Sequence, residues 1–286
     1  MSQVLLVTGS SRGLGREIVE AALAAGHRVV ATARRSERLA DLVEKYGEQV
    51  RAVALDVADP EAAAHAVRTA VDAFGRLDVL VNNAGYANLA AVEDITLDDF
   101  REQVETNLFG VVTVTKAALP VMREQGSGHI LQVSSVGGRL ASVGLSAYQS
   151  AKWAVGGFSS VLAQEVAPLG ITVTVLEPGG MRTDWAGSSM TIPPVSAPYQ
   201  QTVGERARLM PTTTMTGDPA KVAQVVLDVA AMAEPPLRLL LGSDAYRYGT
   251  AAGRALAESD ERWRELSVST DHDAATAADI DPLRRT

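Results

Sequence analysis

Residues 3–26 read Q-V-L-L-V-T-G-S-S-R-G-L-G-R-E-I-V-E-A-A-L-A-A-G, and this strand–turn–helix pattern sets the plan of the chain. The apolar run at 3–8 is typical of a buried strand. Gly9, Gly13 and Gly15 follow, and apolar residues then recur at helical spacing up to Gly26. Glycines let a backbone approach a pyrophosphate, and a helix N-terminus offers N–H donors to the anion. The stretch therefore predicts a nucleotide-binding turn, with a plain tight turn as the alternative.

The same alternation continues along the chain. Further strands are predicted at 28–33, 50–55, 79–81, 129–133, 171–176 and 237–241, and helices at 60–74, 96–125 with a break near Pro120, from Tyr148 to about Pro168, and 219–233. Strands that alternate with helices predict an α/β fold: a single doubly wound Rossmann-type domain with a parallel seven-stranded sheet. Ligands in such sheets bind beyond the carboxyl ends of the strands.

Composition narrows the class of protein. The 286 residues are 47% hydrophobic and 21% charged, as expected for one globular domain. The net charge of −8 argues against nucleic acid or an anionic membrane as a partner. The chain has no cysteine and only four scattered histidines, so we expect no metal site. We see no leader and no membrane-length apolar run, so the cytoplasm is the expected location.

The end of the second predicted strand carries Ala33, Arg34 and Arg35. A carboxylate here would bind the ribose hydroxyls of NAD, whereas arginine accommodates the additional phosphate of NADP. Ala33 stands at the acidic position, and Arg12 lies in the glycine turn. The pattern favours an NADP clamp. The alternative is that Arg34 and Arg35 are only solvated charges at the start of a helix.

Residues 134–152 contain the serine pair Ser134–Ser135 followed by Tyr148 and Lys152. Residues four apart share one face of a helix, so the phenol and the amine can act together. An ammonium beside a phenol favours the phenolate and should lower the tyrosine pKa from its usual value near 10. Ser135 could fix a carbonyl oxygen near the phenol. Tyrosine and lysine at this spacing also occur by chance on surface helices. The neighbouring motifs therefore decide whether Tyr148 and Lys152 are read as a catalytic pair or as a chance pair.

Two segments depart from the alternation. Residues 181–216, rich in Ser, Thr, Pro and Met and including Trp185 and Tyr199, follow a strand end and predict a substrate lid. Residues 245–266 predict an amphipathic helix, and the polar chain from about 267 predicts a mobile tail. We therefore expect a 1–242 domain with its lid, followed by a 243–286 C-terminal helix and tail. Gly156 and Gly157 inside the Tyr148 helix indicate close packing on the sheet or against a second subunit.

Together the motifs resemble those of the short-chain dehydrogenase/reductase family over about residues 3–242. They are T-G-S-S-R-G-L-G (8–15), N-N-A-G (82–85), the asparagine of E-T-N-L-F-G (105–110), Ser135, Y-Q-S-A-K (148–152) and P-G-G-M-R-T (178–183). The resemblance implies a Rossmann-type sheet and reversible hydride transfer between NAD(P) and an alcohol or carbonyl. It also implies a homodimer or homotetramer.

By the resemblance, Tyr148 is the acid–base residue and Ser135 binds the substrate oxygen. Lys152 lowers the phenol pKa and holds the nicotinamide ribose, and Asn107 supports the lysine through a water. Ser134 is expected to be structural. Cofactor contacts are implied for Tyr148 and Lys152 and for Gly9, Ser11, Arg12, Gly13, Leu14, Arg34, Asp56, Val57, Asn83, Ala84, Gly85, Pro178, Gly179 and Thr183.

The sequence thus predicts an NADP(H)-dependent oxidoreductase that interconverts a carbonyl (ketone or aldehyde) and an alcohol. The Met, Pro and Trp residues of 181–216 suggest a moderately apolar small molecule. One alternative is a non-catalytic NADP-binding sensor or scaffold of the same fold, but such a protein is free to lose Tyr148, Lys152 or Ser135, and all are present. A second alternative is a methyltransferase on a similar sheet, but such a protein is expected to carry an acidic residue at the end of the second strand, where this chain has Ala33.

Overall fold

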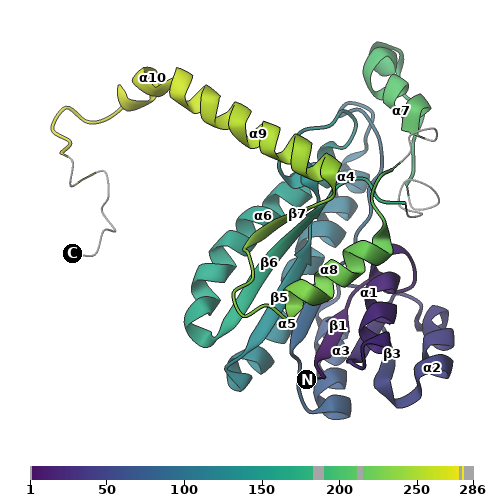
Figure 1. Ribbon diagram of the computed structural model, residues 1–286. Coiled ribbons are helices and arrows are strands. Elements are labelled where there is room, and N and C mark those ends of the chain that lie inside the picture. Colours follow the sequence, from purple (N-terminus) through teal and green to yellow (C-terminus); the bar gives the residue numbers. More distant parts are fainter. Residues whose placement is uncertain (1, 183–189, 211–214, 277–278, 280–286) are drawn as a thin grey trace.

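The computed structural model describes residues 2–182, 190–210, 215–276 and 279. Its centre is a seven-stranded parallel sheet in the order β3-β2-β1-β4-β5-β6-β7 (Figure 1). The strands are β1 (Val4–Val7), β2 (Arg28–Ala33), β3 (Val50–Ala54), β4 (Val79–Asn82), β5 (Gly128–Val133), β6 (Ile171–Pro178) and β7 (Arg238–Leu241). The seven predicted strands are confirmed. The strand order reverses between β1 and β4, which is where a doubly wound sheet opens a ligand crevice.

Helices cover both faces of the sheet. They are α1 (Gly13–Ala24), α2 (Ala40–Tyr46), α3 (Pro60–Phe74), α4 (Leu97–Val104), α5 (Gly110–Gln125), α6 (Ser146–Val166), α7 (Glu205–Leu209), α8 (Pro219–Ala230), α9 (Ser243–Arg262) and α10 (Arg264–Val268). Buried side chains of α1, α2 and α8 form one core with the sheet. Those of α3, α5 and α6 form a second core on the other face. The fold is therefore doubly wound, as predicted.

Strand β1 shows why the sequence forms this sheet. Leu5 and Val7 belong to the core under α1 and α8, whereas Val4 and Leu6 belong to the core on the opposite face. Successive side chains of a strand point to opposite faces. A strand that is buried on both faces therefore reads as a continuous apolar run, and this is the pattern seen at 4–7.

The predicted break near Pro120 is wrong. Helix α5 continues through Pro120, whose neighbours Ala118 and Met122 are buried in the core. The irregularity lies earlier, at the π-helical turn η3 (Glu105–Phe109). There Nδ2 of Asn107 donates to the carbonyl oxygen of Gln103 at 2.8 Å, the acceptor that the backbone N–H of residue 107 would use in an α-helix. A side-chain donor thus reaches a backbone acceptor within this turn, and π-helical turns are frequent at functional sites.

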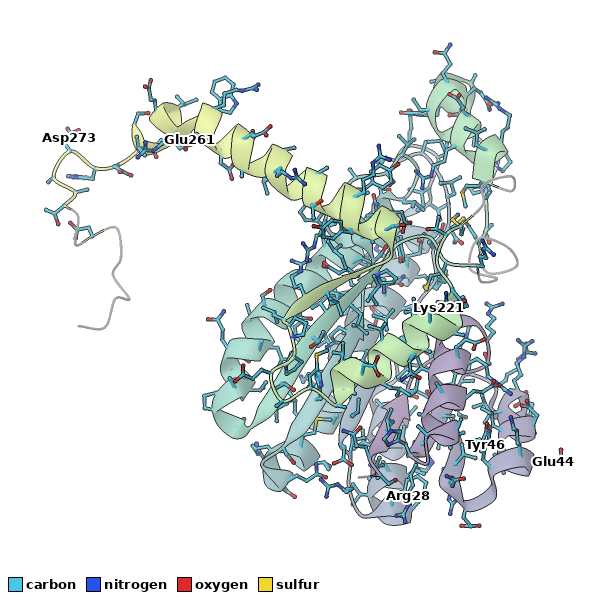
Figure 2. All side chains as sticks on the ribbon, viewed as in Figure 1. Arg28, Glu44, Tyr46, Lys221, Glu261 and Asp273 are labelled. Atoms are coloured by element: carbon cyan, nitrogen blue, oxygen red, sulfur yellow. The ribbon has the colours of Figure 1, made fainter. Side chains whose placement is uncertain are left out.

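Two other elements differ from expectation. A 3₁₀ turn, η1 (Ser36–Leu39), and α2 follow β2 where no helix was predicted, and they bury Leu39 and Leu42. The helix predicted at 245–266 is divided at Trp263 into α9 and α10. It extends away from the sheet, so that Glu261 and Asp273 lie far from the body (Figures 1 and 2).

The two glycines of α6 have different surroundings. A Cβ on Gly156 would lie 2.9 Å from a guanidinium nitrogen of Arg238 in β7, so α6 packs closely on the sheet at this position. A Cβ on Gly157 would meet nothing within 4 Å. In the described part of the chain, no helix is both long and apolar enough to cross a bilayer.

Candidate functional site

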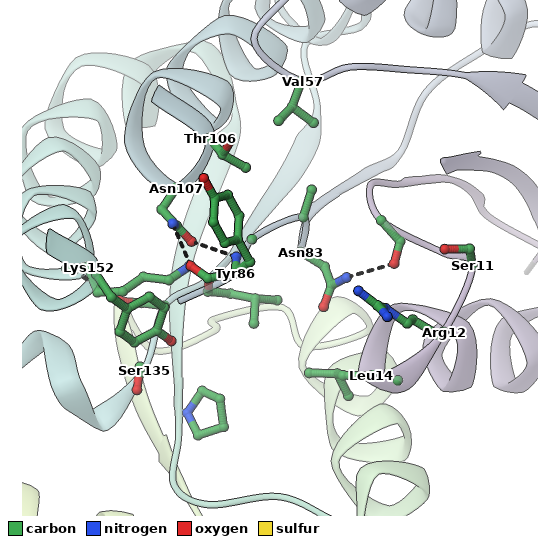
Figure 3. Close-up of a pocket in the computed structure, with 18 of the residues that line it drawn as sticks. Ser11, Arg12, Leu14, Val57, Asn83, Tyr86, Thr106, Asn107, Ser135 and Lys152 are labelled. Atoms are coloured by element: carbon green, nitrogen blue, oxygen red, sulfur yellow. Dashed lines mark hydrogen bonds between the residues drawn. The ribbon is translucent and has the colours of Figure 1, made fainter. Parts of the chain in front are cut away.

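A cavity of about 750 Å³ opens at the carboxyl edge of the sheet (Figure 3). It brings together every predicted site residue that the structure describes. These are Gly9, Ser11, Arg12, Gly13, Leu14, Arg34, Asp56, Val57, Asn83, Ala84, Gly85, Asn107, Ser135, Tyr148, Lys152, Pro178 and Gly179. The predicted site residue Thr183, and Trp185 of the predicted lid, lie outside the described residues.

The glycine turn after β1 fits the approach of a phosphate group. Gly9 and Gly13 have φ of +69° and +57°, a region that favours glycine. A Cβ on Gly9 would lie 2.9 Å from the Cα of Ala84, and one on Gly15 would lie 2.4 Å from the carbonyl oxygen of Gly9. Helix α1 begins at Gly13, so its positive end borders the cavity. These residues form a cradle that side chains would fill, as a dinucleotide cofactor requires.

Asn83 holds this turn against the end of β4. Its Nδ2 donates to the carbonyl oxygens of Thr8 at 2.9 Å and Gly9 at 3.2 Å. In return, the Thr8 hydroxyl accepts the N–H groups of Asn83 and Ala84, both at 2.9 Å. The Asn83 amide is therefore used to fix the two loops that border the cavity.

Tyr148 lies on α6 with 8% of its surface exposed. Burial raises the pKa of Tyr148 to about 12, while a hydrogen bond with Ser135 acts in the opposite direction. The net shift is opposite to the one expected from the Tyr–Lys spacing. The reason is that desolvation penalises a phenolate in this apolar surrounding. At neutral pH the phenol is therefore a proton donor.

Lys152 lies one helical turn further along α6 and is 3% exposed. Its Nζ donates to the carbonyl oxygen of Val133 at 2.8 Å and lies 5.7 Å from the centre of the Tyr148 ring. Burial lowers the pKa of Lys152 to about 8. The Ser134 hydroxyl donates to the Lys152 carbonyl oxygen at 3.2 Å, which fits the structural role expected for it.

Asn107 approaches Lys152 through Gly85. The Asn107 amide exchanges two hydrogen bonds with the backbone of Tyr86, at 3.2 Å and 2.8 Å (Figure 3). A Cβ on Gly85 would lie 2.5 Å from Oδ1 of Asn107 and 3.5 Å from Nζ of Lys152. Only glycine fits between the amide and the amine. The π-helical turn thus places Asn107 beside the lysine.

The end of the cavity beside β2 carries more arginines than predicted. A smaller cavity of about 80 Å³ is lined by Arg12, Arg34, Arg35 and Arg38 together with Ser11 and Ala33. Arg38 was missed because it lies in η1, which was not predicted. Arg38 could have been predicted from its spacing, because Arg34, Arg35 and Arg38 lie within about one helical turn of each other in the sequence.

The cavity also includes residues for which no role was predicted. Among them are Tyr86, Glu102, Thr106, Met181 and Met215. Burial raises the pKa of Tyr86, and the charge of Glu102 adds to this shift. The position of Tyr86 directly after N-N-A-G was the available signal.

A buried ion pair supports the loop that carries Ser135. Glu177, near the end of β6, is fully buried and accepts hydrogen bonds from Nε of Arg139 at 2.7 Å and from Nε of Arg238 at 3.1 Å. Arg139 closes the 3₁₀ turn η4 (Val136–Gly138) that follows Ser135. One carboxylate thus joins this loop to β6 and β7.

The predicted lid is joined at its base and packs beside Tyr148. The N–H of Gly217 donates to the carbonyl oxygen of Gly180 at 2.8 Å, which pairs the two ends of the segment. Within the segment, Val203 is buried in a cluster with Tyr148, Leu89 and Leu145. The described part of 181–216 therefore adds apolar surface next to the catalytic candidate.

Replacing Lys152 by Met is expected to stabilise the protein at pH 7. The unfolded chain keeps its lysine protonated up to pH ~10.5, whereas the folded protein loses this proton above about 8. Burying the charge therefore costs up to about 3 kcal/mol below pH 8, and the cost disappears as pH rises from 8 to 10.5. The variant also loses the hydrogen bond from Lys152 to the carbonyl oxygen of Val133, which reduces its gain in unfolding free energy by about 1 kcal/mol.

The measurement is the free energy of unfolding of wild type and Lys152→Met at pH 7 and pH 10. The advantage of the variant should shrink with rising pH, because the wild type alone gains stability in that window. If the difference in unfolding free energy between the two proteins were the same at pH 7 and pH 10, the lowered pKa of Lys152 would be contradicted.

The chain is similar to known proteins in sequence and in fold. The family model described as short chain dehydrogenase matches residues 3–191. Oxidoreductase BOA17 of Botryotinia fuckeliana is 59% identical over 94% of this chain and 100% of its own length. A solved short-chain dehydrogenase from Streptomyces avermitilis has a TM-score of 0.88 and 40% identity, covering 95% of this chain and 100% of that one. The closed form of serine dehydrogenase complexed with NADP+ has a TM-score of 0.74 and 28% identity, covering 84% and 94%.

Proposed function

The chain belongs to the short-chain dehydrogenase/reductase family, and from that premise we propose that it is an NADP(H)-dependent oxidoreductase that interconverts a ketone or aldehyde and an alcohol. The observation that carries the proposal is the group formed by Ser135 and the buried side chains of Tyr148 and Lys152, which lie in one cavity with the glycine turn. A non-catalytic NADP-binding protein would not require this group.

The nicotinamide ring, when bound, supplies or accepts the hydride. In the reducing direction, Tyr148 donates its proton to the substrate oxygen as negative charge develops there, and its raised pKa keeps it protonated for this step. Ser135 donates a hydrogen bond to the same oxygen and holds it beside the phenol. Lys152, with Asn107 next to it, binds the ribose and helps to return a proton to Tyr148.

The arginines at the end of β2 support NADP as the cofactor. A guanidinium can hold a phosphate with two parallel charge-assisted hydrogen bonds. Arg12 and Arg34 border the cavity from the glycine turn and from the end of β2, and Arg35 and Arg38 add positive charge to the same corner. Ala33 offers no acceptor to the hydroxyls of NAD.

We expect NADPH to bind ~10- to 100-fold more tightly than NADH, since a hydrogen bond to a charged group contributes ~1.5–3 kcal/mol. The double variant Ala33→Asp with Arg34→Ala should reverse this preference by repelling the phosphate and accepting from the NAD ribose. Parallel titrations of both cofactors measure it. Arg101→Ala, which removes an exposed arginine of α4, is the matched control. Equal or tighter binding of NADH by the wild type would remove the NADP assignment.

We further propose that 181–216 is a substrate lid and that the substrate is moderately apolar. The cluster of Leu89, Leu145 and Val203 around Tyr148 supports both statements. The exposed side chains of Trp153 and Val161 lie on one face of α6 with Gly157 between them, and support a homodimer or homotetramer. A monomer in sedimentation experiments would contradict that assembly.

A further inference from the structure

Helix α9 carries a row of small and apolar residues that begins against the body of the protein. This row, the α9 stripe, follows the alternating spacing of four and three residues that lets one helix pack along another. Its members are Ala245, Gly249, Ala252, Leu256, Ser259 and Trp263. Ala245 and Gly249 are buried. A Cβ on Gly249 would lie 2.8 Å from Cδ2 of Leu240, so the first part of the stripe packs closely on the edge strand β7.

The stripe becomes exposed as α9 extends away from the body (Figure 1). Ala252 is half-buried, whereas Leu256 and Trp263 are 61% and 58% exposed. The outer part of the stripe therefore presents large apolar side chains to solvent on the same helix face that packs on β7. An exposed apolar face that is continuous with a packed one marks an interaction site.

The outer part of the stripe is complementary to itself. If two copies of α9 lie antiparallel, with a two-fold axis between Ala257 and Glu258, residues whose numbers add to 515 face each other. Trp263 of each copy then lies opposite Ala252 of the other. In the same way, Leu256 lies opposite Ser259. Each layer joins one large and one small side chain, and a two-fold axis makes every such contact twice.

The charges beside the stripe fit this register. In the antiparallel pair, the residues that flank the stripe meet each other, so Arg262 faces Ala255 and Asp260 faces Gly253. A shift of seven residues that moves the copies apart would place Asp260 opposite its own equivalent, and Arg262 likewise. Like charges at such positions repel. A shift in the other direction would place the second helix against Gly249, where the body already lies.

The end of α9 fits the length of the exposed stripe. Helix α9 ends at Arg262, and α10 follows after Trp263, whose φ of −100° and ψ of 11° depart from α-helical values. In the antiparallel pair, Trp263 lies opposite Ala252, the residue at which the body begins to cover the stripe. A helix that continued straight past this point would meet the body of the other copy. The chain changes direction at the position where the pair requires it.

We propose that the α9 stripe from Ala252 to Trp263 binds the same stripe of a second copy of this chain, antiparallel across a two-fold axis. The antiparallel arrangement also sets the positive end of each helix beside the negative end of the other. This contact is separate from the α6 face that carries Trp153 and Val161. It does not depend on the proposed reaction, because no residue of the stripe lines the cavity.

The first test is the mass of the assembly in sedimentation experiments. The wild type should sediment with at least twice the mass of one chain. Leu256→Glu combined with Trp263→Glu should halve the mass of the assembly, since both changes place charges in the paired stripes. Val92→Glu, which changes another exposed apolar residue, is the matched control and should leave the mass unchanged. An unchanged mass for the double variant, or a monomeric wild type, would overturn the proposal.

The second test fixes the register by cross-linking. The chain has no cysteine, so each introduced thiol reports on one position. Ala255→Cys and Arg262→Cys place thiols beside the stripe and leave Leu256 and Trp263 intact. A short bis-maleimide should join an equimolar, co-expressed mixture of the two single variants, because residue 255 of one copy faces residue 262 of the other.

Each single variant alone should cross-link much more slowly. Its two thiols lie seven residues apart along the pair, a separation of about 10 Å along the axis. Equal rates for the mixture and the single variants would overturn the register, and no cross-link in the mixture would overturn the contact. Carbonyl reduction by a protein that fails to cross-link would leave the reductase standing. A cross-linked protein that reduces no carbonyl compound would count against the reductase alone.

Discussion

Replacing Tyr148 by Phe is expected to lower kcat for carbonyl reduction by ~10²-fold or more, the scale of general acid catalysis. The change removes the proton donor and keeps the ring in its cluster with Leu89 and Val203. The Kd of NADPH should therefore remain close to the wild-type value. Steady-state kinetics on a verified substrate and a cofactor titration measure the two effects separately.

Tyr199→Phe is the matched control, because it removes a phenol hydroxyl from the same apolar cluster. That hydroxyl donates to the exposed carboxylate of Glu93 at 2.8 Å and takes no part in the proposed proton transfer. The kcat of the Tyr199→Phe variant should be close to that of the wild type. Near wild-type turnover by Tyr148→Phe would show that the proton comes from another group.

Replacing Glu177 by Ala is expected to lower the free energy of unfolding by ~3 kcal/mol or more, the usual result when one partner of a buried ion pair is removed. Glu177 is fully buried, and the side chains of Arg139 and Arg238 are only 29% and 31% exposed. Without the carboxylate, the two guanidinium groups would repel each other beside α6. Denaturant unfolding of both proteins at pH 7 gives the difference.

The control is Asp98→Ala, which removes an ion pair with Arg101 whose side chains are 90% and 72% exposed. An exposed pair contributes ~0–1 kcal/mol, so this change should be almost neutral. If Glu177→Ala cost no more than Asp98→Ala, the buried carboxylate would not be holding the Ser135 loop.

Much of the fold could be predicted because its signals are local. Strands that are buried on both faces leave continuous apolar runs, and β1 was predicted in this way. The cavity residues follow strand ends, so the topology of a parallel sheet was enough to gather them. Helix α3 was predicted at 60–74, and its observed bounds are the same.

The features that could not be predicted depend on contacts between distant residues. Glu177 meets Arg139 and Arg238, which are 38 and 61 residues away, and no sequence pattern marks that pairing. The π-helical turn coincides with a side-chain hydrogen bond of Asn107, which the periodicity of the sequence does not indicate. Spacing placed Lys152 beside Tyr148 but said nothing of the depth of burial, and burial decides the direction of the Tyr148 pKa shift.

The strand order also bears on how the protein can be made. During synthesis β2 and β3 extend the sheet on one side of β1, and β4, β5, β6 and β7 then extend it on the other. Every strand that leaves the ribosome thus meets a free edge, and no strand has to enter between two that are already paired. Native pairing can therefore proceed from the N-terminus while the remainder is still being translated. Strand β4 begins the second half by pairing with β1, and the crevice between the halves is completed only when β5, α6 and β6 add Ser135, Tyr148 and Gly179.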